Sequence, residues 1–191
     1  MKRRIMSSTL GALILVMGGW VQSLAQAPGS GSSPFSPASV GVCIQSTIFS
    51  GGSASSLEPY DAKITLLEIV RGQRAWDLIK QASPSNKPPI EGSEYVVARI
   101  RFEYSAKGVP GDKAWELTLG QFTALSSEGK QYETPSLVLP KPELSGKLRS
   151  GDSIEGWRAF QVIREDAKPL MCFDPASGGG MVRGKVVWFQ L

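Results

Sequence analysis

The chain has 191 residues, with 21 lysines and arginines against 17 aspartates and glutamates, two cysteines and no histidine. A chain without histidine cannot use a Ser-His-Asp or Cys-His catalytic arrangement, and it cannot supply histidine ligands to zinc. Two cysteines are also too few for a structural zinc site, which takes four protein ligands.

Residues 1–27 are typical of a secretory signal peptide. A Lys-Arg-Arg run at residues 2–4 precedes an apolar stretch over residues 10–21, and residues 25–27 read Ala-Gln-Ala, the small-x-small pattern that precedes a cleavage site. The apolar stretch has about a dozen residues, which is shorter than the roughly 20 that span a bilayer. We therefore predict an exported protein, periplasmic or secreted, with no transmembrane segment after signal cleavage.

Removal of the signal peptide also changes the charge. Its three basic residues supply most of the net charge of +4, and the remaining chain has 18 basic against 17 acidic side chains. A nearly neutral protein gives no electrostatic reason to expect nucleic acid as a partner. Residues 28–39 are rich in Gly, Ser and Pro, which predicts a flexible linker, and residues 40–191 are expected to form one domain.

The domain begins with two predicted strands. Residues 40–48 have alternating apolar character, and we expect them to form an edge strand. Residues 62–70 are rich in β-forming side chains, and the alternation places Ile64, Leu66 and Val70 on one face of the strand.

The periodicity then changes to that of a helix. In residues 74–82, Ala75, Leu78, Ile79 and Ala82 recur at the spacing of one helix face. We predict a short helix here, because the following residues include prolines that cannot continue it.

The clearest strand pattern covers residues 95–104. Apolar residues at every second position alternate with a face that carries Arg99, Arg101 and Glu103. This pattern is typical of an antiparallel strand with one face toward the core and one toward water. The charged face is either ordinary solvated surface or a docking stripe, for which Arg99 and Arg101 are the candidate residues.

Further strands are predicted at residues 115–125, 131–134, 154–162, 169–173 and 181–191. About seven strands with turn signals between them and one helix indicate an all-β protein. The predicted fold is an immunoglobulin-like antiparallel β-sandwich with one short helix near residues 74–82.

An ordered set of short motifs carries a resemblance to a known family. The motifs are Arg71-Gly72, Ala75-Trp76, Asn86-Lys87-Pro88-Pro89, Glu91 to Val96, Leu125 to Tyr132, Gly151 to Trp157, and Phe160-Gln161-Val162. Over residues 60–191 this set resembles exported bacterial domains of unknown function with an immunoglobulin-like fold, related to the mycobacterial secreted immunoprotective antigen. The resemblance implies an extracytoplasmic module and carries over no catalytic residue.

The two cysteines, Cys43 and Cys172, are a candidate disulfide. Both lie in apolar, strand-like contexts near opposite ends of the domain, and export to an oxidising compartment favours a bridge. The alternative is two separately buried thiols, since a free cysteine behaves as a small apolar side chain.

Four tryptophans follow the signal peptide. Trp115 and Trp188 are in phase with core positions and are expected to be buried. Trp76 and Trp157 have no such assignment, and an exposed tryptophan is a good candidate for an interface anchor or a sugar-stacking platform.

Carboxylates are the remaining route to chemistry. Glu91 and Glu94 flank a strand start, and Glu165 is followed by Asp166, so either pair could meet a hard cation or act in glycoside hydrolysis. Acidic residues at strand ends are more often solvated or paired, and no calcium-binding loop of the EF-hand type is present. We predict no catalytic residue, no metal site and no cofactor.

These observations favour an exported, non-enzymatic binding or protein-interaction module with a protein or glycan partner outside the cytoplasm. The alternative is a cell-envelope accessory domain with a carboxylate metal site or weak hydrolase activity.

Overall fold

The structure is a computed structural model that describes residues 30–50, 57–106, 114–179 and 182–191. The predicted signal peptide, residues 1–27, lies outside the described residues. Among the residues that are described, no helix has both the length and the apolar character needed to cross a membrane.

The described chain forms short and long strands, one α-helix and two 3-10 turns. In chain order these are β1 (Cys43–Ser50), β2 (Glu58–Arg71), α1 (Gly72–Ala82), β3 (Ser93–Ala106), β4 (Trp115–Leu117), η1 (Leu119–Gln121), β5 (Phe122–Leu125), β6 (Gly146–Leu148), β7 (Ser153–Ile163), β8 (Leu170–Phe173), η2 (Pro175–Gly178), β9 (Val182–Gly184) and β10 (Val187–Gln190).

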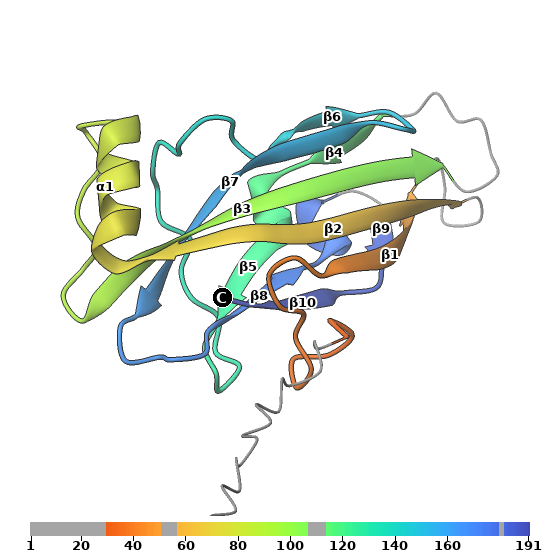
Figure 1. Ribbon diagram of the computed structural model, residues 1–191. Coiled ribbons are helices and arrows are strands. Elements are labelled where there is room, and N and C mark those ends of the chain that lie inside the picture. The colour runs from red at the N-terminus through yellow and green to blue at the C-terminus, as the bar shows by residue number, and fades with distance from the viewer. Residues whose placement is uncertain (1–29, 51–56, 107–113, 180–181) are drawn as a thin grey trace, which may run out of the picture.

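The strands form three antiparallel sheets. The largest has the order β7-β3-β2-β1-β9, a second has the order β10-β8-β5, and β4 pairs with β6. Figure 1 shows β5, β8 and β10 lying across one face of the long strands β2 and β3, with α1 at one end of those strands.

The core lies between the five-stranded and the three-stranded sheet. Phe173 on β8 is fully buried, and its ring centroid lies 5.4 Å from that of Phe102 on β3 and 5.1 Å from that of Phe122 on β5. These contacts join the inner faces of the two sheets into one apolar cluster. The predicted all-β sandwich is therefore confirmed.

The predicted helix is also confirmed, and it packs on the outer face of the five-stranded sheet. Ala75 and Ile79 are its buried residues, and they share an apolar cluster with Val70, Val97 and Ala159 from three neighbouring strands. The helix therefore covers one end of the outer face and leaves the rest of that face to polar side chains.

Two predicted strands are each divided between two sheets. Residues 115–125 form β4, a 3-10 turn and β5, and residues 181–191 contribute the separate strands β9 and β10. The strand predicted at residues 131–134 is reduced to a single bridge between Leu125 and Gln131. The predicted edge strand, β1, instead lies between β2 and the short strand β9.

Residues 30–39, expected to belong to a linker, pack against the domain. Ala38 is fully buried and bridges Phe189, its amide donating to the Trp188 carbonyl oxygen at 2.9 Å. The Trp188 amide donates to the Gly31 carbonyl oxygen at 2.9 Å. Backbone hydrogen bonds to an edge strand can fix a segment whose composition alone predicts flexibility.

Candidate functional site

The outer face of the five-stranded sheet carries a charged cluster on β3 and β7. Arg99 donates to Glu155 at 3.0 Å (Nη2 to Oε2), and Arg101 donates to the other carboxylate oxygen at 2.7 Å (Nε to Oε1). The hydrogen bond from Arg101 is the main cause of a lowered pKa at Glu155. Because all three side chains are solvent-accessible, these ion pairs stabilise the fold only weakly.

Trp157 lies beside this cluster, two residues after Glu155 on the same face of β7. Pairing places Arg99 on β3 directly between Glu68 on β2 and Trp157 on β7. Trp157 is half-buried, and part of it packs with the apolar cluster beneath α1. The structure therefore brings three of the four predicted interface residues together on one face.

A cavity of about 380 Å³ opens where α1 meets this row. We call it the outer pocket. Its floor is apolar and its rim is polar, with lining from Val70, Leu78, Trp157, Glu68, Arg74, Asp77 and Gln81. Small-molecule sites commonly combine an apolar lining with a few polar groups in this way.

The rim of the outer pocket is largely unpaired. Within the described part of the chain, the side chains of Glu68, Arg74 and Gln81 make no hydrogen bond or ion pair, and Asp77 accepts one hydrogen bond from Gln73 at 2.7 Å. All four rim side chains are exposed. Their donors and acceptors are thus available to a ligand.

A β-bulge in β2 builds one wall of the outer pocket. The register between β2 and β3 shifts between Leu66 and Glu68, so that Leu67 is the extra residue. A bulge reverses the alternation of faces, which moves Glu68 and Val70 from the core side to the outer face. The expectation that Val70 shares a face with Leu66 is therefore wrong, and the reversal supplies one floor and one rim residue of the pocket.

The backbone of Trp157 is fixed at the edge of the sheet. Its amide donates to the Pro142 carbonyl oxygen at 2.8 Å, and its carbonyl oxygen accepts from the Leu144 amide at 3.2 Å. These bonds pair the outer edge of β7 with residues 142–144. The tryptophan is consequently held on a rigid element.

Trp76 is separate from this site. It is half-buried, it packs 6.1 Å from the ring of Tyr95, and it does not line the outer pocket. The helix residues that do line the rim were not predicted, because exposed charged residues on a helix carry no sequence signal that separates a binding group from ordinary surface.

The predicted disulfide is not formed. Both thiols are free, with Cys43 exposed and Cys172 buried, and burial raises the pKa of Cys172 to about 11. In β1 the buried residues Ser46 and Ile48 are at even positions, so Cys43 lies on the opposite, outer face. In β8 both neighbours of Cys172, Met171 and Phe173, face the core, so Cys172 faces away from it. The two thiols therefore face away from the core on different sheets, where they cannot meet.

The candidate carboxylates have roles within the fold. Glu94 accepts from Arg71 Nε at 2.8 Å, whereas Glu91 and Glu165 are exposed. Asp166 accepts from the hydroxyl of Tyr132 at 2.7 Å and from two backbone amides. Burial would raise the pKa of Asp166, but these hydrogen bonds outweigh it and the pKa is lowered. In the described ranges, no three acidic or cysteine side chains are grouped as metal ligands.

Arg158 follows Trp157 but points into the core. It is 2 % exposed, its guanidinium lies 5.2 Å from the centre of the Phe160 ring, and it makes one long hydrogen bond of 3.4 Å to the Phe122 carbonyl oxygen. Burial lowers its pKa to about 10, so it keeps its charge at neutral pH. It lies on the opposite face from the outer pocket and lines no part of it.

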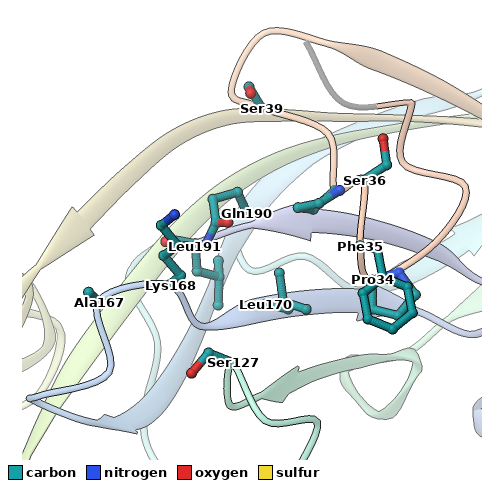
Figure 2. A pocket seen from close by; sticks show the side chains of 11 residues that line it. Pro34, Phe35, Ser36, Ser39, Ser127, Ala167, Lys168, Leu170, Gln190 and Leu191 are labelled. Carbon is teal, nitrogen blue, oxygen red and sulfur yellow. Dashed lines mark hydrogen bonds between the residues drawn. The ribbon is translucent and has the colours of Figure 1, made fainter. Parts of the chain in front are cut away.

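A second cavity, of about 660 Å³, lies on the three-stranded side of the molecule. Figure 2 shows Pro34 and Phe35 on one side of it and Ala167 and Lys168 on the other. Phe35 is 96 % exposed, and Lys168 is the one charged side chain among its lining residues. Its aromatic residue, Phe35, is exposed and lies outside the strands, and the cavity lacks the several charged groups of the outer pocket, so it is the weaker candidate.

Two tyrosines, the buried Tyr60 and the partly buried Tyr132, predict how the stability of the protein changes at high pH. Burial, with a hydrogen bond to Glu58, raises the pKa of Tyr60 to about 12, and burial with a hydrogen bond to Asp166 raises that of Tyr132 to about 12. Both pKa values in the folded protein exceed the ordinary value of 10.0. The contribution of the two un-ionised tyrosines to the free energy of unfolding is therefore complete below pH 10 and is lost as the pH rises toward 12. The lowered pKa of Arg158 acts in the opposite direction, because its contribution to stability increases as the pH rises above 10. It is one group against the two tyrosines.

We therefore expect unfolding and tyrosine ionisation to occur together above pH 10. Circular dichroism and tyrosinate absorbance, recorded in one pH titration, measure the two events. A Tyr132→Phe variant should remove one component of the absorbance change. Full tyrosine ionisation in a protein that remains folded would contradict the burial of these hydroxyls.

Comparisons with known proteins do not assign a family. No family model and no curated protein matches the chain. Among solved structures it is similar to the "putative lipoprotein (ycdA)" from Bacillus subtilis, with a TM-score of 0.48 and 14% identity, over 68% of this chain and 36% of that chain. It is also similar to the yjhA protein from Bacillus subtilis, with a TM-score of 0.45 and 11% identity, over 73% of this chain and 82% of that one. The chain thus spans about a third of the first of these proteins.

Proposed function

We propose that this chain is an exported, non-enzymatic binding module that takes its ligand in the outer pocket. The observation that carries the proposal is the combination of an apolar floor with a largely unpaired polar rim, assembled from β2, α1 and β7. Export is supported by the sequence of residues 1–27, and the lack of histidine removes the commonest catalytic arrangements.

The site has the features of a prepared binding surface. Its tryptophan sits on a strand paired on both sides, and a bulge directs Glu68 outward. The backbone that carries Trp157 is thus held before a ligand binds, and only the exposed rim side chains have to be ordered on binding. Membership in the family of exported immunoglobulin-like domains related to the mycobacterial antigen is part of the same proposal. Its support is the ordered set of short motifs in residues 60–191.

Two sets of variants test this function. Trp157→Leu removes the aromatic floor, and the double change Glu68→Gln with Arg74→Gln alters only the exposed rim. We expect each to weaken binding to a cell-envelope extract of the producing organism by about tenfold, since central aromatic and charged groups carry most of the binding energy.

Trp188→Leu is the matched control. Trp188, which the sequence predicted to be buried, is half-buried like Trp157, because Val187 and Phe189 take the core-facing positions of β10. It belongs to the three-stranded sheet and does not line the outer pocket. It should bind like the unchanged protein. Equal binding by all four proteins, with folding verified by circular dichroism, would contradict the assignment of the outer pocket.

A further inference from the structure

We infer that the ligand of the outer pocket is an uncharged segment of a carbohydrate, an inference that rests on the proposed function. The size of the pocket gives the first argument. At about 380 Å³ it lies at the low end of the range of roughly 300–1,000 Å³ for small-molecule sites. It suits one unit of a larger polar ligand better than the folded surface of a protein.

The apolar floor of the outer pocket favours a sugar ring. Trp157, Val70 and Leu78 form an apolar surface in which the aromatic ring is the largest element. A sugar ring has one face made mainly of C–H groups, and that face packs well on an aromatic ring while its hydroxyls point sideways. The floor therefore favours a ligand that is apolar on one face and polar at its edge.

The polar rim of the outer pocket favours an uncharged ligand with many hydroxyl groups. It combines two carboxylates, Glu68 and Asp77, with the guanidinium of Arg74 and the amide of Gln81. The neighbouring Arg99 is already paired with Glu155. Because the rim carries both signs of charge, it does not select a ligand of a single charge, whereas hydroxyl groups both donate and accept and can bond to every one of these side chains.

A peptide that adds a strand is the main competing ligand, and the position of the pocket disfavours it. Strand addition needs an unpaired sheet edge. The outer pocket lies on the face of the sheet, and the nearest edge, that of β7, is already paired with residues 142–144. Such a peptide would have to displace this segment.

The test uses one cell-envelope extract in three forms: untreated, digested with a protease, and solvolysed with anhydrous hydrogen fluoride, which cuts glycosidic bonds and spares peptide bonds. Each is titrated into the isotopically labelled protein, and the signals of the Trp157 indole and the Gln81 side-chain amide are followed by NMR. We expect equal shifts from the untreated and the protease-digested extract, and at least tenfold weaker binding after solvolysis.

The other outcomes separate the two proposals. Shifts that survive solvolysis, or that disappear after protease digestion, would overturn the carbohydrate assignment and leave the binding function in place. No shift at these two side chains with any of the three extracts would overturn both. The rim variant Glu68→Gln with Arg74→Gln keeps the floor intact, so that loss of binding in this variant does not arise from a damaged core.

Discussion

Phe173→Ala should destabilise the protein by about 3–5 kcal/mol, the cost of removing a fully buried aromatic side chain and leaving a cavity. Phe173 is 0 % exposed, and its ring contacts Phe102 from the opposite sheet and Phe122 from its own sheet. A loss of this size is a large part of the roughly 5–15 kcal/mol that stabilises an ordinary domain. Chemical denaturation, followed by fluorescence, measures it.

Phe35→Ala is the control for this change. Phe35 is 96 % exposed, so the same substitution there should change the free energy of unfolding by no more than about 0.5 kcal/mol. If the two variants were equally stable, Phe173 would not join the two sheets.

Gly156→Ala has the second large expected effect. A Cβ atom at this position would lie 2.5 Å from the Leu144 nitrogen and 2.6 Å from the Glu143 carbonyl carbon. Backbone atoms cannot move aside as a flexible side chain can, so the segment paired with β7 must shift. We expect a loss of about 1–3 kcal/mol, as for other overpacked positions. Because the neighbouring Trp157 is bonded to the same segment, ligand binding should weaken as well.

Gly120→Ala provides the matched control. An added Cβ there would find its nearest neighbour, the Ser177 carbonyl oxygen, at an ordinary contact distance of 3.6 Å. Thermal unfolding of the two variants side by side gives the comparison. A Gly156→Ala protein as stable as Gly120→Ala would mean that residues 143–144 do not lie against β7.

The sandwich and its helix could be predicted because both depend on local periodicity. Alternation along residues 95–104 distinguishes the inner face of β3 from the outer face with Arg99 and Arg101, and the structure keeps that division. The change to helical spacing after Gly72 likewise predicts which face α1 packs on the sheet. Of the four residues on that face, Ala75 and Ile79 are buried, and Leu78 and Ala82 are half-buried.

Local periodicity fails where the chain adds a residue or changes sheet. The single extra residue Leu67 in β2 reverses the faces of Glu68 and Val70, and no composition signal marks it. Residues 115–125 and 181–191 each pass from one sheet to another while apolar residues continue to face the same core. An unbroken apolar pattern therefore conceals the division into two strands.

The candidate site could be predicted only in part. Trp157, Arg99 and Arg101 were recognisable as residues without a core assignment, and they do meet on one face. The contribution of α1 depends on how the helix docks, which a single sequence does not reveal. The cysteine pairing failed for a related reason, since sequence spacing says nothing about the opposite faces that Cys43 and Cys172 occupy.

The most direct test of the outer pocket as the binding site is to map by NMR chemical shifts where the envelope ligand contacts the labelled protein. The largest shifts should fall on the outer pocket, at Glu68, Arg74, Gln81 and Trp157. Shifts centred instead on the second cavity, at Phe35, Lys168 and Gln190, would contradict this assignment.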